Sequence, residues 1–592
     1  MFRWYFLNYL YFEVIEFYTC LRKCLKENDN AVFSYVLKAC SELCGLDMGR
    51  RVHCQIVKVG NPDSVVVTGI ANMYAKCGEI ECSRRVFDEY PGGNVVSWTS
   101  MIVGYVQNDR SGDGLVLFNQ MRECVVEPNE FTIGTLLTAC TKLDALHQGK
   151  WVHGYMISKG IDSNSFSVAA LVDMYVKCGA VTDARLVFDG LITADFVPWT
   201  AMIVGYSQRN YPVEALALFT DRKWVGVMPN SVTITSVLSA CAQSNSTDFG
   251  RSVHTLGIKL GLEDASMANA LVHMYAKCRM IKEASCIFDR ISEKDVVSWN
   301  SMITGYSQNG FASEALSLFC QMRYSYSLDP ITMVSVLSAC ACIGAHKIGC
   351  ALHSHSIKDG FLSSNIYVGT ALLNLYSKSG DSESSRRVFD EMGDKNIVTW
   401  SAMMSGYGMH GDVTGSVTLF SEMLKENLEP NEVVFTNILS ACGHTGMVGE
   451  GWSFFQSMCK EYHVIPSMKH YVCMVDLLAR AGKIEEAMDF IERIPIQSDE
   501  RVWGALLHGC RLHSRLDLGE VAARRMLELQ PDSAGYYVLI SNFFASDGRW
   551  TQADKLRELM KERRLSKFPG CSLVEMDQSH HPSSSLKVAP LP

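Results

Sequence analysis

Three features that would identify common protein classes are missing from this 592-residue sequence. There is no run of about 18 apolar residues, so we expect no membrane-spanning helix and no membrane partner. None of the 22 cysteines forms a Cys-x-x-Cys pair, the spacing typical of zinc and redox sites. Most cysteines lie in apolar helical patterns such as Ser-Ala-Cys, which indicates buried thiols in a reducing compartment. With no nucleophile–base pattern either, we predict no metal, no cofactor and no enzymatic activity.

An excess of charge of one sign is also missing. The formal net charge is −9 with 20% charged and 48% hydrophobic residues, which is typical of a soluble protein with a large core. This balance excludes a uniformly basic nucleic-acid binder but allows a local basic stripe. Glu13 and Glu16 lie in an aromatic N-terminal segment that lacks the Arg- and Ser-rich composition of a transit peptide. We therefore expect the chain to begin within a repeat, with no visible targeting segment.

One sequence frame occurs four times. VVSWTSMIVGYVQ, FVPWTAMIVGYSQ, VVSWNSMITGYSQ and IVTWSAMMSGYGM place Trp98, Trp199, Trp299 and Trp400 at spacings of 101, 100 and 101 residues. A recurring histidine keeps the same period (His53, His153, His254 and His353) and has no ligand partner at metal-binding spacing. A fixed period of this kind indicates a repeat architecture. The tryptophans and histidines are accordingly predicted to be packing residues.

Each period divides into parts of 35, 35 and 31 residues, for example 95–129, 130–164 and 165–195. Apolar residues at i, i+3, i+4 and i+7 predict two helices in each part, and Gly104 inside the first pattern is tolerable if the helices pack closely there. A single short helix pair cannot bury its apolar face, whereas stacked pairs can. We therefore predict an all-α fold, a right-handed α-solenoid superhelix of stacked antiparallel helix pairs.

The pattern resembles the plant pentatricopeptide-repeat proteins of the PLS class, whose P, L and S units are matched by VVSWTSMIVGY, VLSAC and ALVDMYVKCG. RVWGALLHGCRL and YYVLISNFFASDGRW resemble the C-terminal extension repeats of the E subgroup. The resemblance implies the following division: 1–29 a partial repeat, 30–94 L and S repeats, 95–195, 196–295 and 296–396 three PLS triplets, 397–499 the final P, L and S repeats, 500–567 two extension repeats, and 568–592 a disordered tail.

The same resemblance implies a sequence-specific single-stranded RNA-binding protein of organelles, a site-recognition factor for C-to-U editing. It favours the mitochondrion, with the chloroplast as the alternative. No His-x-Glu and Pro-Cys-x-x-Cys signature of a zinc deaminase occurs, so the deaminase is expected in trans, with the last repeats as its docking surface. A protein-interaction scaffold, or an RNA processing or stability factor without an editing role, remains an alternative.

Base reading in this family implies roles for the second, fifth and last residues of a unit, since two or three side chains of one repeat read one base. The base-reading pairs are Thr68/Asn94, Thr99/Asn129, Thr200/Asn230, Asn269/Asp295, Asn300/Asp329, Thr370/Asn396 and Ser401/Asn431. The base-sandwiching residues are Val65, Val96, Val197, Val297, Tyr367 and Val398. Phe166 and Ser266 hold the second position of the other S units, where Ser266 is a poor clamp. The L-type fifth residues Gly134, Thr235 and Val334 carry little information.

The family code implies adenine for Thr or Ser with Asn and uracil for Asn with Asp, which predicts 5′-A A n n A n U U n A A, with n unread. Ala169 beside Asp195 offers no hydrogen bond, and Pro330 is an alternative to Asp329 as the reading residue. The Asn and Asp residues are also explained as helix caps. Four lysines at position 13 of the S units are expected to approach RNA phosphates: Lys76, Lys177, Lys277 and Lys378.

Overall fold

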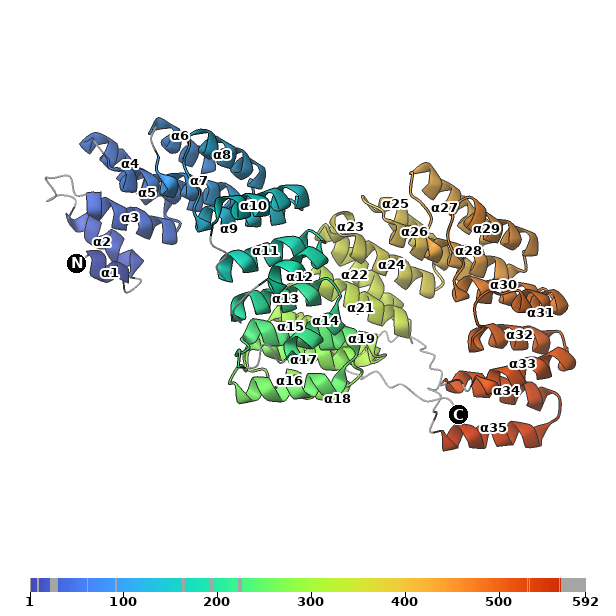
Figure 1. Cartoon of the computed structure of the whole chain (residues 1–592). Helices are drawn as coiled ribbons and strands as arrows, with labels where there is room; N and C mark the ends of the chain where they lie inside the picture. The colour runs from blue at the N-terminus through green and yellow to red at the C-terminus, as the bar shows by residue number, and fades with distance from the viewer. Residues whose placement is uncertain are drawn as a thin grey trace. The chain divides into compact units, whose positions relative to one another are not determined.

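A computed structural model describes residues 2–565 of the protein apart from 8–9, 22–29, 61, 91–92, 162–164, 191–194, 222–225, 530, 532 and 564. Every regular element in this part of the chain is an α-helix (Figure 1). The all-α prediction is therefore confirmed. The chain forms two compact units, Met1–Ile287 and Phe288–Pro592. The predicted tail 568–592 lies outside the described residues.

Helices alternate between two roles, which we call helix A and helix B of each repeat. The A helices are α3 (Asn30–Glu42), α5 (Ser64–Lys76), α7 (Val95–Gln107), α9 (Glu130–Lys142), α11 (Ser165–Lys177), α13 (Phe196–Gln208), α15 (Ser231–Ser244), α17 (Ala265–Lys277), α19 (Val296–Gln308), α21 (Pro330–Ile343), α24 (Ile366–Lys378), α26 (Ile397–Met409), α28 (Glu432–Thr445), α30 (Met468–Arg480), α32 (Glu500–Leu512) and α34 (Ala534–Ser546).

The B helices follow them after short turns. They are α4 (Leu46–Val59), α6 (Ile80–Glu89), α8 (Ser111–Glu123), α10 (Leu146–Lys159), α12 (Val181–Asp189), α14 (Pro212–Thr220), α16 (Thr247–Lys259), α18 (Ile281–Arg290), α20 (Ala312–Met322), α22 (His346–Lys358), α25 (Ser382–Glu391), α27 (Val413–Lys425), α29 (Val448–Lys460), α31 (Ile484–Glu492), α33 (Leu516–Glu528) and α35 (Trp550–Glu562). Three further helices are α1 (Phe2–Leu7), α2 (Tyr11–Leu21) and α23 (Phe361–Ser364).

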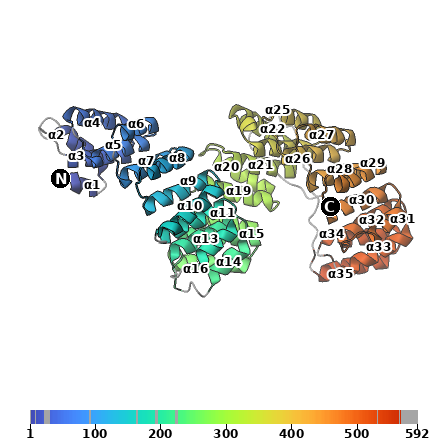
Figure 2. The same cartoon turned by 45° about the horizontal axis from the view of Figure 1, so that its top comes forward.

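Within each unit the helix pairs stack in chain order. Each A helix contacts the next A helix, as α7 does with α9 and α30 with α32. Each B helix that lies within one unit packs on its own A helix and, in most repeats, on the A helix that follows, as α8 does with α7 and α9. Figure 2 shows this order clearly for α30 to α35. The stacked antiparallel pairs of an α-solenoid are therefore present, as predicted from the repeat.

The A helices approach one another closely at a glycine of the repeated frame. A Cβ atom added to Gly104 would lie 2.9 Å from the Cβ of Ala75 on α5. A Cβ on Gly205 would lie 2.7 Å from Val176 Cγ2 on α11. Both distances are shorter than real contacts between such atoms, so a side chain at either position would force the helices apart. This explains why a residue of poor helix propensity stands inside an A helix.

The cysteine that recurs near the end of the L-type A helices and the recurring histidine act as packing residues, whereas other cysteines, such as Cys124 and Cys320, are exposed. Cys140, near the C-terminal end of α9, is fully buried, and burial raises its pKa to about 11, so the thiol stays protonated. Its counterparts Cys241, Cys340 and Cys442 are also fully buried. Each recurring histidine holds a tyrosine on the next A helix: Nδ1 of His153 lies 2.9 Å from the hydroxyl of Tyr175. The predicted packing role of these histidines is confirmed.

Candidate nucleic-acid interface

The last residue of a repeat is the N-cap of the A helix that follows. The side chain of Asn94 accepts hydrogen bonds from the backbone N–H groups of Val96 and Ser97, both at 3.1 Å. The same role falls to Asn129, Asp195, Asn230, Asp295, Asp329, Asn396 and Asn431. The alternative interpretation as helix caps is thus correct. Asp329 holds the equivalent position in its repeat, whereas Pro330 is the first residue of α21.

Capping uses one oxygen of each side chain, and the other polar atom takes no part in the cap. In Asp195 this second atom accepts from the Ser165 hydroxyl, and in Asp329 it accepts from Asn300 Nδ2. In Asn129 the capping oxygen accepts from the Thr132 backbone N–H at 2.9 Å, so the amide nitrogen must be the second atom. In Asp329 the capping oxygen accepts from the Thr332 backbone N–H at 2.7 Å, and the second atom is again an oxygen. An Asn cap therefore presents hydrogen-bond donors at this point of the repeat, and an Asp cap presents an acceptor.

The fifth residue of the repeat lies beside this cap. Asn300 donates from Nδ2 to both carboxylate oxygens of Asp329, at 3.1 and 2.9 Å. Thr99 reaches Asn129 through one intermediate, since Thr99 Oγ1 lies 2.7 Å from Thr132 Oγ1, which in turn lies 2.9 Å from Asn129 Oδ1. These predicted pairs are therefore brought together by neighbouring A helices, although their members are about 30 residues apart.

The other pairs follow the same arrangement with some exceptions. Thr68, Thr200 and Thr370 each contact a hydroxyl on the next A helix, at 2.9, 2.8 and 3.3 Å. Ser401 instead donates to its own helix, to the carbonyl of Ile397 at 2.7 Å. Asn269 belongs to the first unit and Asp295 to the second, so their pairing stays a prediction.

The second residues of the repeats are apolar and exposed. The exposed fraction is 62% for Val65, 55% for Val96, 57% for Val297, 73% for Tyr367 and 59% for Val398. Val197 differs, since its side chain is half-buried. Exposed apolar side chains that recur at one position of most repeats are not required by the core, and such surfaces usually bind something.

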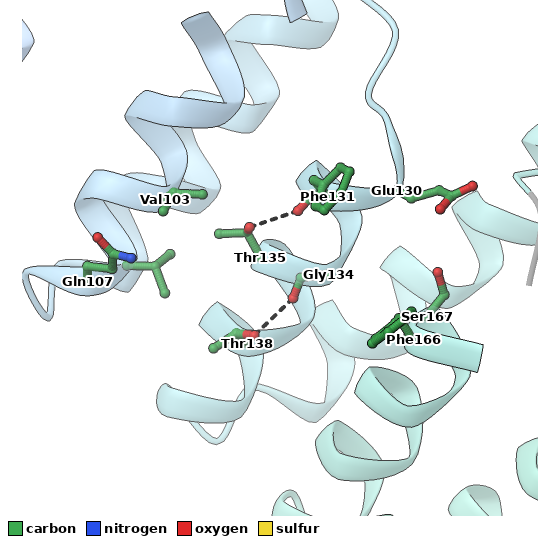
Figure 3. A pocket seen from close by; sticks show the side chains of 10 residues that line it. Val103, Gln107, Glu130, Phe131, Gly134, Thr135, Thr138, Phe166 and Ser167 are labelled. Carbon is green, nitrogen blue, oxygen red and sulfur yellow. Dashed lines mark hydrogen bonds between the residues drawn. The ribbon is translucent and has the colours of Figure 1, made fainter. Parts of the chain in front are cut away.

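Two further second-position residues, Phe131 and Phe166, line a groove with a volume of about 620 Å³ between α7, α9 and α11. In Figure 3 Phe131 stands at the start of α9 and Phe166 at the start of α11, with Gly134 between them. The two phenylalanines are 79% and 75% exposed. A Cβ on Gly134 would meet no atom within 4 Å, so the absent side chain leaves the groove open. Aromatic side chains with accessible faces suit a flat ligand.

An equivalent groove of about 330 Å³ lies in the second unit, with Ile331 and Tyr367 in the places of the two phenylalanines. Sequence reasoning missed Phe131 and Ile331 because the L-type repeats were judged by their fifth residue alone. The signal that would have found them is the position itself, since both occupy the second place of their repeats.

The four predicted phosphate-contacting lysines are exposed and end the A helices α5, α11, α17 and α24. Eight residues separate each lysine from the fifth position, which is about 12 Å along the helix axis. Lys76 Nζ lies 2.8 Å from Glu42 and Lys177 Nζ lies 3.0 Å from Asp173. No described residue forms an ion pair with Lys277 or Lys378. Surface ion pairs contribute little, so all four cations are available to a stronger anion.

Over the described residues, no group of three or more His, Cys, Asp or Glu side chains could hold a metal ion. In that same part of the chain no helix is long and apolar enough to span a membrane. The fold and the recurring capped pairs define an α-solenoid repeat protein that presents a similar set of polar and apolar side chains from one repeat to the next.

Comparison with known proteins identifies the family. The profile described as PPR repeat family matches residues 93–142, 194–243 and 395–444. The profile described as PPR repeat matches residues 266–296, 297–326, 370–397, 433–463 and 469–495. The profile described as E motif matches residues 513–575. The chain belongs to the pentatricopeptide-repeat family, and its repeats and E motif are those of the PLS class, E subgroup.

Among its relatives is a mitochondrial pentatricopeptide repeat-containing protein of Arabidopsis thaliana, 55% identical over 97% of this chain and 84% of that protein. A chloroplastic protein of the same plant is 38% identical over 93% of this chain and 68% of its own length. Solved structures include PPR10 from maize, 17% identical with a TM-score of 0.46 over 96% of this chain and 88% of that chain. PPR10 in complex with an 18-nt psaJ RNA element gives 16% identity and a TM-score of 0.47 over 91% and 85%.

Proposed function

We propose that this protein binds single-stranded RNA in a sequence-specific manner and acts through binding rather than catalysis. The observation that carries the proposal is the recurring pair formed by the fifth residue and the capping residue. Members of the pair vary in hydrogen-bonding character while the helix frame around them stays the same. A repeat that presents one such pair per step fits a polymer of stacked, flat units with polar edges.

The Thr99/Asn129 pair suits adenine or cytosine. Thr99 has one hydroxyl proton, and both of its neighbours, the Val95 carbonyl at 2.7 Å and Thr132 Oγ1 at 2.7 Å, lie within hydrogen-bond distance to take it. Its oxygen is then left as an acceptor, beside the donor Nδ2 of Asn129. The Watson–Crick edges of adenine and cytosine present an amino group beside a ring nitrogen, which is the complement. The family code selects adenine.

The Asn300/Asp329 pair has the opposite character. The second oxygen of Asp329 accepts, and Asn300 Nδ2 carries two protons, of which one can serve a ligand. Uracil and guanine present a ring N–H beside a carbonyl oxygen, and the family code selects uracil. With the remaining pairs, this supports an RNA read as 5′-A A n n A n U U n A A, where n is unread.

The second-position side chains supply affinity without base choice. A base inserted between Phe131 and Phe166 would stack on both rings, and such stacking contributes roughly 1–3 kcal/mol per base. The valines at other steps offer smaller apolar faces. The lysines at the ends of α5, α11, α17 and α24 would add phosphate contacts that depend on salt but not on sequence.

The finer role that we propose is site recognition for C-to-U editing in an organelle, with a cytidine deaminase as a partner protein. The E motif over residues 513–575 supports this role. Helices α28 to α35, which form the last L and S repeats and the two extension repeats, would provide the docking surface. The mitochondrial name of the 55% identical relative favours the mitochondrion, and the chloroplastic names of others keep the chloroplast as the alternative.

The test is to select RNA from a random pool with the full chain at a stated salt concentration. We expect enrichment of the adenine-rich sequence with UU at its centre. Failure to bind any RNA at low salt would favour the protein-interaction scaffold. The double variant Thr99→Asn with Asn129→Asp should shift one base of the selected sequence from adenine towards uracil. An unchanged preference would remove this pair from the reading set.

Editing is tested separately from binding. The purified chain, a matching RNA with a nearby cytidine and a cytidine deaminase of the same organelle are combined, and conversion of C to U is measured. RNA binding without stimulation of the deaminase would instead favour an RNA processing or stability factor.

A further inference from the structure

A buried hydroxyl occupies the third position of most A helices whose cap belongs to a predicted reading pair. Thr132, Thr233, Thr332 and Thr399 all have an exposed fraction of 0%. Each donates to the capping side chain, at 2.9, 2.9, 2.7 and 3.1 Å respectively. Ser97 does the same towards Asn94 at 3.2 Å. Ser298, also fully buried, donates to Asp295 at 2.7 Å. The hydroxyl therefore lies within hydrogen-bond distance of the cap in six repeats.

The same hydroxyl also contacts the fifth residue of the preceding repeat. Thr132 lies 2.7 Å from Thr99, and Thr332 Oγ1 lies 2.5 Å from Asn300 Oδ1. It thus stands between the two members of the pair and touches both of them. A hydroxyl has one proton and two lone pairs. Thr132 can therefore donate to Asn129 Oδ1 and accept from Thr99, whereas Thr332 has two acceptors beside its one proton, Asp329 Oδ1 and Asn300 Oδ1.

At most steps where the pair is incomplete or unread the hydroxyl is absent. The exception is Ser167, the buried third residue of α11, which follows the L-type repeat of Gly134. Pro198 holds the third position at the Ala169/Asp195 step, where the fifth residue has no polar group. Val66, Met267 and Val368 hold it after L-type repeats, whose fifth residues are not predicted to read. Among the predicted reading pairs whose members lie in one unit, the exception is Ser401/Asn431, which is followed by Val434.

Helix capping does not require the hydroxyl, although Thr132 also completes a capping box by accepting from the backbone N–H of Asn129 at 3.3 Å. At Val434 the cap is intact, since Asn431 Oδ1 accepts from the backbone N–H groups of Val433 and Val434, both at 3.1 Å. Asn365 caps α24 in the same way beside Val368, at 3.0 and 3.2 Å. A buried hydroxyl costs free energy unless it is hydrogen-bonded, so its placement between two polar side chains calls for another explanation.

We infer that the third-position hydroxyl is a specificity-determining positioning residue. By contacting the capping oxygen and the fifth residue at once, it holds the donor and acceptor atoms of the pair in one fixed arrangement. Thr132 is expected to orient the Thr99 oxygen and the Asn129 amide towards the base edge, without touching the base itself. The inference rests on the proposed RNA-binding function and adds to it a residue that sets base choice from outside the reading pair.

The test uses the full chain and RNAs that differ only at the base facing Thr99 and Asn129. The ratio of dissociation constants for guanine and adenine at that base measures preference. Thr132→Val removes the hydroxyl without changing side-chain size and should lower this ratio about threefold to tenfold, the worth of a hydrogen bond of this kind. Thr132→Ser should restore it. Thr141→Val is the matched control, because Thr141 lies on the same helix and donates only to the Leu137 carbonyl, at 2.8 Å.

The converse variant guards against a loss of folding. Val434→Thr adds the hydroxyl beside the intact Asn431 cap and should raise adenine preference at the Ser401/Asn431 step by a similar factor. The inference is overturned if Thr132→Val and Val434→Thr both leave the ratios unchanged while affinity or melting temperature changes. Base reading at the Thr99 step is tested by the same ratio. If the wild-type ratio is near 1 and the Thr99→Asn/Asn129→Asp variant leaves it unchanged, both base reading at this step and the inference are overturned.

Discussion

Replacing Phe131 by alanine is expected to weaken RNA binding strongly while leaving the stability of the fold almost unchanged. Its ring is 79% exposed, so Phe131→Ala removes little buried surface, and surface substitutions of this kind change stability by about 0.5 kcal/mol or less. If the ring stacks on a base, its removal costs roughly 1–3 kcal/mol of binding free energy. At about 1.4 kcal/mol per factor of ten, this is a 5- to 150-fold weaker dissociation constant. The loss should be the same for every base at that step.

The assay is RNA binding by titration at fixed salt, with the thermal unfolding midpoint measured in parallel. Leu186→Ala is the matched control: Leu186 is 72% exposed, but it lies on helix B of its repeat. Phe131→Ala with Phe166→Ala should lose less than the sum of the two single changes, because both rings would hold the same base. Less than a twofold loss for Phe131→Ala at an unchanged unfolding midpoint would refute the stacking argument.

Three further outcomes follow from particular contacts. Gly104→Ala should destabilise the fold by about 1–2 kcal/mol in urea unfolding, because its Cβ would overlap that of Ala75, and adding Ala75→Gly should restore part of the loss. Lys378→Ala should lower affinity equally for all RNA sequences and reduce the salt slope by about 0.7, and an unchanged slope would contradict the phosphate contact. Burial lowers the pKa values of His53, His153 and His353, so in acid the unfolded chain binds more protons than the folded chain. The free energy of unfolding should therefore fall as the pH drops through about 6.5, the ordinary histidine pKa, and level off below the folded pKa values. The urea unfolding midpoint at each pH checks this.

Much of the candidate site was predictable because it depends on local rules. The fifth and last residues of the repeat stand out in the sequence because they vary within a fixed frame. Asn and Asp before an apolar helical pattern are also ordinary N-cap signals. Thr132 was not predictable as a partner of Thr99, since nothing in the local pattern says that a residue 33 positions later faces it.

The sequence by itself determined the repeat period, the alternation of helices and the place of each capping residue, since these follow from hydrophobic spacing and cap chemistry within a few residues. Only the tertiary structure decided which side chains of successive repeats meet. Phe131 and Phe166 form one groove, Asn300 contacts Asp329, and Lys76 contacts Glu42 because neighbouring A helices pack at a fixed register. That register is a property of whole packed helices, and glycines such as Gly104 allow it by keeping the helices close.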